Sequence, residues 1–290
     1  NLKNTIMEKL KIIECSRDAM QGWAHQISTE QKVRYVNQLL KVGFDTIDFA
    51  SFVSHKLIPQ MSDSHAVADQ INITGHESKL LAIVLNKRGA EEALQHQNIH
   101  YLGFAYSVSP TFQKRNANNS PEGSFEDIQY IYELCKKAGK ELVVYLSMAF
   151  GNPYGDSYSD KIVAHAAEKI SAIGVNILSL SDTVGLASAT QIEKLVKNII
   201  RLFPEKEIGV HLHSRMENWK DKLNAAHDNG CYRFDGAING YGGCPMAEDE
   251  LIGNMNTGLM VRYFLQKGYK MNINLDELKI AEQMASEIFL

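Results

Sequence analysis

The 290-residue sequence predicts one TIM (β/α)8 barrel followed by an extra C-terminal helix, and three observations favour this fold. Short, β-rich apolar runs alternate with longer amphipathic stretches along the whole chain. Several of these stretches end in a glycine of the kind that terminates a helix. No linker rich in proline, glycine or serine divides the chain, so we expect one catalytic domain over 1–290, with the barrel at about 10–270 and the last helix at about 275–290.

Eight runs have the length and composition of buried strands. They are Leu10–Cys15, Phe44–Phe49, Lys79–Leu85, Ile99–Ser107, Glu141–Ser147, Val175–Leu180, Glu207–His213 and Arg233–Ile238. Eight strand–helix units in a chain of this length match a closed barrel better than a doubly wound open sheet.

Amphipathic helices are predicted between the runs, with weaker patterns after the second and third runs. The clearer helices are Glu30–Val42, Phe125–Ala138, Asp160–Ile173, Ala189–Phe203, Trp219–Asn229 and Glu250–Gln266. The segment Leu275–Leu290 is the extra helix.

The composition favours an enzyme that acts on a small molecule. The 30 Lys and Arg residues against 34 Asp and Glu give no basic field for nucleic acid or a membrane surface. No run approaches the roughly 20 apolar residues of a membrane span, and the first residues lack the pattern of a signal peptide. The four cysteines have no CxxC spacing, so a reducing cytosol is expected, or a mitochondrial matrix after removal of a transit peptide.

In a barrel of this kind the chemistry lies at the C-terminal ends of the strands. His211 and His213 share the end of the seventh run, and their spacing points both side chains the same way. Two imidazoles and an oxygen ligand from Asp18 suit Mg, Mn, Co or Zn. The alternative is that the two histidines only fill polar positions of the barrel.

Two neighbouring charges, Arg17 and Asp18, follow the first run. Arg17 is a permanent cation that can stabilise an enolate oxygen as negative charge develops on it. Strand alternation would point the two side chains apart, so both can serve one site only if the backbone leaves β geometry after Cys15. The alternative is a solvated ion pair.

Other polar residues near strand ends carry weaker signals. A loop with three glycines surrounds Cys244 and suggests a mobile lid whose thiol takes part in proton transfer. Asn254 can bind the metal or cap the next helix. Asp182 and Thr183 can bind substrate or form a turn, and the long polar loop with Lys114 and Asn116 suits anionic phosphate groups.

From Ile13 to beyond Thr257 these segments resemble the HMG-CoA lyase family of DRE-TIM metallolyases. The motifs that carry the resemblance are Arg17-Asp18 with Gln21, Ser51–Ser54 with Pro59–Met61, Thr111-Phe112 with Lys114 and Asn116, Phe150–Tyr154, Ser181–Gly185, the His211 and His213 pair, and Gly242–Pro245.

The resemblance implies cleavage of HMG-CoA to acetyl-CoA and acetoacetate by a homodimer that uses a divalent cation, with Mg or Mn as the first expectation. Its implied metal ligands are Asp18, His211, His213 and Asn254. Its implied catalytic residues are Arg17, Asp48, His211 and Cys244. The residues expected to contact the acyl-CoA substrate are Gln21, Ser51, Lys114, Asn116, Asp182 and Thr183. Coenzyme A has no motif of its own here, because no glycine-rich phosphate loop follows the first strand.

Three departures from the family pattern keep other functions open. Asp48 stands where the family has Glu, Ser214–Glu217 replaces Asp-Thr-Tyr-Gly, and the Cys244–Asn254 loop is one residue longer. A condensing enzyme that joins acetyl-CoA to a 2-oxo acid, or a related aldolase, would keep Arg17, Asp18 and the histidine pair. A non-catalytic barrel would keep only the shape.

Overall fold

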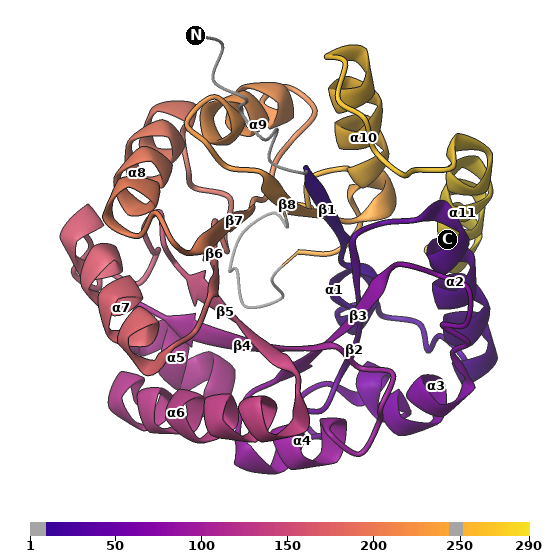
Figure 1. Ribbon diagram of the computed structural model, residues 1–290, viewed down its shortest axis with the longest axis horizontal. Coiled ribbons are helices and arrows are strands. Elements are labelled where there is room, and N and C mark those ends of the chain that lie inside the picture. Colours follow the sequence, from indigo (N-terminus) through magenta and orange to yellow (C-terminus); the bar gives the residue numbers. More distant parts are fainter. Residues whose placement is uncertain (1–9, 244–251) are drawn as a thin grey trace, which may run out of the picture.

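The computed structural model describes residues 10–243 and 252–290, and within these ranges the chain closes into a barrel of eight parallel strands (Figure 1). Each strand pairs with its sequence neighbours, and β8 closes the barrel against β1. The longer helices form a ring outside the strands, as Figure 1 shows. The predicted TIM barrel with an added C-terminal helix is therefore confirmed.

Each of the eight predicted runs overlaps one strand, and the observed ends differ from the predicted ends by at most two residues. The strands are β1 (Lys11–Glu14), β2 (Thr46–Ser51), β3 (Lys79–Val84), β4 (Tyr101–Ser107), β5 (Glu141–Ser147), β6 (Ile177–Ser181), β7 (Glu207–His211) and β8 (Arg233–Gly236). β7 ends at His211, so His213 lies just beyond the strand, where it forms an isolated bridge with Asn254.

The helices alternate with the strands in the predicted order. The α-helices are α1 (Ser16–Gln21), α2 (Thr29–Val42), α3 (Ser64–Gln70), α4 (Lys87–Ala93), α5 (Pro110–Ala117), α6 (Pro121–Ala138), α7 (Asp160–Ile173), α8 (Ala189–Leu202), α9 (Trp219–His227), α10 (Thr257–Gln266) and α11 (Leu275–Ile288). Two short 3-10 helices are η1 (Pro59–Met61) and η2 (Ile238–Gly240).

Two predictions about these segments were wrong. The helix predicted from Glu250 begins at Thr257, because the side chain of Asn256 caps it by accepting a hydrogen bond from the Leu259 N–H. Lys114 and Asn116 lie in α5 and not in a loop, since Ser109 caps this helix and Pro110 occupies its first turn.

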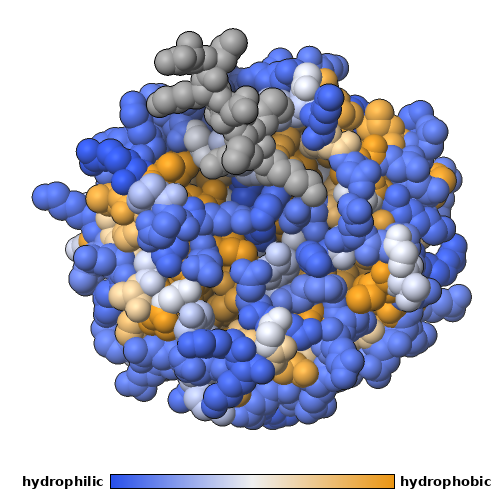
Figure 2. Space-filling model, in the orientation of Figure 1, coloured by the Kyte–Doolittle hydropathy of each residue, from blue (hydrophilic) through white to orange (hydrophobic). Residues whose placement is uncertain are grey.

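The surface carries no sign of a membrane-spanning segment among the described residues, because no helix there combines the required length with an apolar composition. The face drawn in Figure 2 is largely hydrophilic, with hydrophobic residues interspersed among the polar ones.

The C-terminal helix α11 is tied to the barrel at the end of α2. Gly43 ends α2 with a φ of 87°, and a Cβ at this position would lie 2.3 Å from the backbone oxygen of Asn272. The N–H of Asn274 donates to the oxygen of Val42 at 2.9 Å, immediately before α11 begins. This close approach requires glycine at 43.

A buried carboxyl group ends β1. Glu14 is fully buried, and its Oε1 accepts a hydrogen bond from the Ile238 N–H at 3.0 Å. Burial raises the pKa of Glu14 from 4.5 to about 8, although the Ile238 N–H acts in the opposite direction. The folded chain therefore holds this carboxyl in its neutral form near pH 7.

Gly43→Ala should lower the free energy of unfolding more than Gly139→Ala does. Both positions have positive φ, so both variants lose about 1 kcal/mol from the left-handed conformation alone. Only at Gly43 does the new Cβ also meet backbone, whereas nothing lies within 4 Å at Gly139. Urea unfolding measures both losses, and equal losses would contradict the close contact with Asn272.

Glu14 should make the protein less stable as the pH rises. A raised pKa in the folded state means that the stability contributed by the neutral carboxyl is fully present below pH 4.5 and is lost as the pH approaches 8. Glu14→Gln removes this titration. Between pH 4.5 and 8 the free energy of unfolding of the unchanged protein should therefore fall relative to that of the variant. Parallel pH profiles for the two proteins would refute the buried titration.

Candidate active site and metal centre

A cavity opens at the C-terminal ends of the strands, where the fold places catalytic groups. Charged and polar residues from β1–α1, β2 and β7 form one part of its wall, and apolar residues from β3 and the neighbouring loops form another. The lining includes Arg17, Asp18, Gln21, Ser51, Asn116, Thr183, His211 and His213 among the predicted site residues.

Arg17 and Asp18 both reach the cavity because the chain turns into α1 directly after β1. The condition that the backbone leaves β geometry after Cys15 is therefore met. Arg17 is buried, and its Nη1 donates to Asp18 Oδ1 at 3.0 Å and to Gln21 Oε1 at 2.9 Å.

Asp48 accepts hydrogen bonds from the Nε and Nη2 atoms of the Arg17 guanidinium. Arg17 Nη2 donates to Asp48 Oδ2 at 2.5 Å, and Nε lies 3.1 and 3.2 Å from the two carboxylate oxygens. Asp48 therefore reaches Arg17 even though its side chain is one methylene shorter than Glu. The two-point contact fixes the plane of the guanidinium.

The two carboxyl groups beside Arg17 differ in their proton affinity. Burial raises the pKa of Asp48 to about 6, and the ion pair with Arg17 offsets only part of that shift. Burial also acts to raise the pKa of Asp18, but Arg17 and the nearby histidines outweigh it, so this pKa lies below its ordinary value. Asp18 is thus the carboxylate that stays ionised and can bind a cation.

Asp18, His211 and His213 bring one potential ligand atom each to within 4.8 Å of one another. Their donor set of two imidazoles and a carboxylate fits a divalent cation. Beside them, Asn254 donates from Nδ2 to Asp18 Oδ2 at 2.7 Å and to the oxygen of Tyr241 at 2.9 Å.

Among the residues that the structure describes, two buried atoms of this cluster have no hydrogen-bond partner, namely His213 Nε2 and Asn254 Oδ1. Leaving a buried polar atom unpaired is costly, and both atoms carry lone pairs that a metal can accept. Asn254 does not cap α10, since Asn256 does so. The residues present therefore fit a bound divalent cation held by Asp18, His211, His213 and Asn254.

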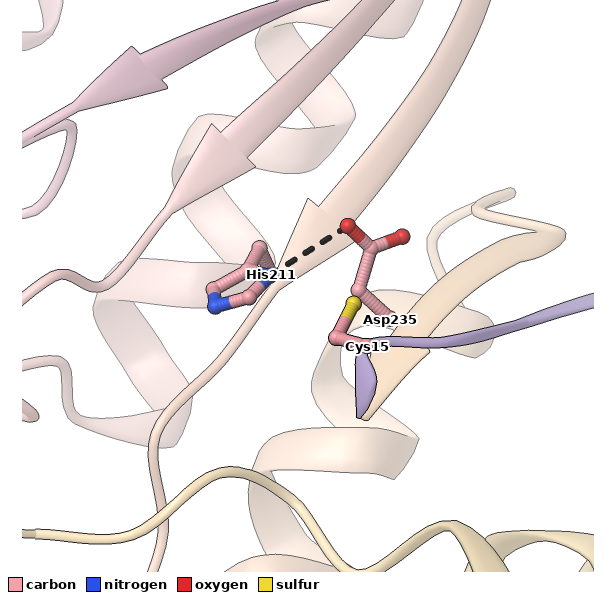
Figure 3. Close-up of side chains that lie close together, drawn as sticks. All are labelled: Cys15, His211 and Asp235. Carbon is pink, nitrogen blue, oxygen red and sulfur yellow. Dashed lines mark hydrogen bonds and ion pairs between the residues drawn. The ribbon is translucent and has the colours of Figure 1, made fainter. Parts of the chain in front are cut away.

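A second group of potential ligands shares His211 and contains Cys15 and Asp235 (Figure 3). Burial raises the pKa of the Cys15 thiol well above its ordinary value, and the carboxylates of Asp235, Asp48 and Asp18 add to the shift. A neutral thiol is a poor metal ligand, and neither Cys15 nor Asp235 lines the cavity. The first group is the better metal centre.

Two predicted substrate-binding residues are absent from the cavity lining, and one predicted catalytic residue falls outside the described residues. Lys114 is exposed on α5 and is absent from the cavity lining. Asp182 is buried and points to Lys222, so its carboxylate is also absent from the lining. Cys244 lies outside the described residues.

Lys222 is a buried residue that the sequence patterns did not single out. Its Nζ donates to Asp182 Oδ2 and to the backbone oxygen of His213, each at 2.7 Å, and to the oxygen of Gly185 at 3.3 Å. Lys222 thereby ties the backbone of a potential metal ligand to the end of β6. Its position one helical turn before the buried Ala226 on α9 is the one sequence signal of its burial.

Comparisons with known proteins agree on one family. The model of the family described as HMGL-like matches residues 9–285. The hydroxymethylglutaryl-CoA lyase of Bacillus subtilis is 32% identical over 271 residues, which cover 93% of this chain and 90% of that protein. The human mitochondrial hydroxymethylglutaryl-CoA lyase is 29% identical over 276 residues, which cover 94% and 84%.

Solved structures give the same result. The crystal structure of the Bacillus subtilis HMG-CoA lyase has a TM-score of 0.91 at 31% identity and covers 97% of this chain and 94% of that one. An HMG-CoA lyase from Acinetobacter baumannii, in complex with coenzyme A and 3-methylmalate, has a TM-score of 0.90 at 28% identity, with 97% and 91% covered.

Lys222→Met should lower the free energy of unfolding by about 3–5 kcal/mol, because it leaves the buried carboxylate of Asp182 without its counter-charge. Adding Asp182→Leu to this variant removes the unpaired charge and should restore most of the loss. Chemical denaturation of the three proteins measures these differences. A single variant as stable as the double variant would show that no buried charge is being compensated.

Proposed function

The chain belongs to the HMGL-like family of lyases, and from this premise we propose that it cleaves 3-hydroxy-3-methylglutaryl-CoA to acetyl-CoA and acetoacetate with a divalent cation, Mg or Mn. The observation that carries the proposal is the convergence of Asp18, His211 and His213 at the cavity, with Asn254 hydrogen-bonded to Asp18 beside them. Within the described residues, His213 Nε2 and Asn254 Oδ1 are buried and have no hydrogen-bond partner. This arrangement suits a substrate that presents adjacent oxygens to a metal.

The choice of substrate rests on the relatives. The relatives from Bacillus subtilis and human are named hydroxymethylglutaryl-CoA lyases, and one solved relative holds coenzyme A and 3-methylmalate. We extend the acyl-CoA substrate from them to this chain. A homodimer is part of the same proposal, as is Cys244 as the thiol of a lid.

In the proposed reaction the tertiary hydroxyl loses its proton to His211 or Asp18, both of which line the cavity. The O–H electron pair forms the carbonyl of acetoacetate while the C–C bond breaks, and its electrons pass to the enolate of acetyl-CoA. Cys244 or a water then protonates the enolate carbon. A bound divalent cation supplies Lewis acidity toward the hydroxyl and its neighbouring oxygen.

Arg17 stabilises the enolate oxygen in this scheme. Its guanidinium borders the cavity and is already held by Asp48, Asp18 and Gln21, so it needs no rearrangement as charge develops. A fixed cation in a buried position is worth more to a developing anion than a mobile one in water.

A condensing enzyme of the same superfamily is the second candidate, and one observation favours it. The segment after His213 departs from the family pattern at Ser214–Glu217, and Met216 within it is strongly exposed. A changed rim of this kind alters what the cavity admits without altering the metal ligands. Such an enzyme would join acetyl-CoA to a 2-oxo acid at the same cation.

The Mn-loaded protein should release acetoacetate from HMG-CoA, and chelation should abolish the activity until Mn is restored. Arg17→Lys keeps the charge but loses the planar fork, so kcat should fall by about 100-fold while Mn²⁺ affinity stays close to that of the unchanged protein. A coupled assay for acetoacetate measures the rates, and calorimetric titration measures Mn²⁺ binding.

No acetoacetate from folded, Mn-loaded protein would exclude HMG-CoA as the substrate. Consumption of acetyl-CoA with a 2-oxo acid by that same preparation would select the condensing enzyme. Loss of Mn²⁺ binding in the Arg17 variant would contradict the assignment of Arg17 to the enolate oxygen, because its main role would then be to hold the metal ligand Asp18.

A further inference from the structure

Asp235 is a fully buried carboxylate that the reaction scheme above does not use. It lies in β8 directly opposite His211, because the register of β7 and β8 pairs these two residues. Residues paired across parallel strands project from the same face of the sheet, so both side chains point into the barrel. Asp235 therefore stands behind a metal ligand and not in the cavity.

The carboxylate contacts one ring nitrogen of His211. Asp235 Oδ2 lies 3.3 Å from His211 Nδ1, and Figure 3 shows the second ring nitrogen on the side of the imidazole away from Asp235. The ring of Tyr145 stands edge-on to the imidazole, with centroids 6.1 Å apart and an interplanar angle of 89°. These two neighbours fix both the direction and the tilt of the ring.

An ionised carboxylate only accepts hydrogen bonds, so the proton between the two groups belongs to Nδ1 of His211. A neutral imidazole that carries its proton on Nδ1 has its lone pair on Nε2. Carboxylates that act in this way behind a metal-binding histidine raise its basicity and fix its tautomer.

We propose that Asp235 is the positioning residue of the metal centre: it holds His211 as the Nδ1–H tautomer, with the ring turned so that Nε2 binds the divalent cation. The inference rests on the metal site proposed above. Of the two bases named in the reaction scheme it selects Asp18, because both ring nitrogens of His211 are then occupied. It assigns a role to a residue that touches neither the cavity nor a ligand atom of Asp18 or His213.

Cys15 offers a competing explanation for the contact between His211 and Asp235, because its sulfur lies beside the same pair. A metal held by Cys15, His211 and Asp235 would use the carboxylate as a ligand. The Cys15 sulfur instead faces the backbone oxygen of Ile13 at 3.9 Å, and the residue is fully buried. The positioning role needs neither a thiolate nor a path for metal to that depth.

Mn²⁺ titration by calorimetry tests the proposal on two variants. Asp235→Leu removes the acceptor and should weaken binding by about 10–100-fold, and Asp235→Asn, whose amide oxygen can still accept, should fall between Asp235→Leu and the unchanged protein. Glu14→Gln is the matched control, because it replaces another buried carboxyl at a strand end, away from His211, and should leave Mn²⁺ affinity unchanged. Thermal unfolding checks that each variant is folded. If Asp235→Leu does not fold, the Mn²⁺ affinity of Asp235→Asn alone decides the test.

The tautomer gives a readout that needs no metal. Nitrogen NMR of histidine-labelled, metal-free protein at alkaline pH should show His211 with its proton on Nδ1, and Asp235→Leu should shift its population toward the Nε2–H form. A purely structural role for Asp235 would change stability and leave the tautomer as it was.

The outcomes separate the two proposals. If the unchanged protein does not bind Mn²⁺, the metal site fails and the positioning role fails with it. If it binds Mn²⁺ and both folded Asp235 variants bind equally well, the positioning role alone is overturned. An equal loss of affinity in Cys15→Ala would also overturn it, because the metal would then lie between Cys15 and Asp235.

Discussion

The buried guanidinium of Arg17 is the constraint on which the site depends. A charge removed from water costs several kcal/mol unless it is paired, and here Asp48 from β2 and Asp18 from α1 provide the pairing. This arrangement requires the chain to turn into α1 immediately after β1 and requires β2 beside it. In the proposed reaction the same cluster of charges would place the guanidinium near the developing enolate and the carboxylate of Asp18 near the metal.

The other residues proposed to bind the metal come from the C-terminal part of the sequence, and buried residues outside the cavity hold them in position. His213 and Asn254 form a bridge beyond the end of β7, and Lys222 ties the oxygen of His213 to Asp182. Asp235 contacts His211 from the neighbouring strand. Side chains that are locked by buried partners hold a metal geometry better than side chains on free loops.

Local pattern was enough to predict the barrel and the histidine pair. The alternation of strands and helices follows from the spacing of apolar residues in the sequence. Two histidines two residues apart on a strand lie on the same face of the sheet, whatever the tertiary structure. Local capping decided the two wrong predictions: Ser109 and Pro110 start a helix through Lys114, and Asn256 starts α10 later than its apolar pattern suggests. Asp235 and Lys222 could not have been found this way, because their roles depend on strand register and on which helix face is buried. The ion pair between Asp182 and Lys222 was also missed, because nothing in the segment around Asp182 points to a partner some forty residues later. The sequence therefore suggested substrate as the partner of this carboxylate.

The position of a bound metal tests the central claim most directly. Anomalous diffraction from a crystal soaked with Mn²⁺ should show a single strong peak at the cavity, within bonding distance of Asp18, His211, His213 and Asn254. A peak between Cys15 and Asp235, or none at the cavity in a crystal whose protein binds Mn²⁺ in solution, would contradict the metal centre described for this barrel.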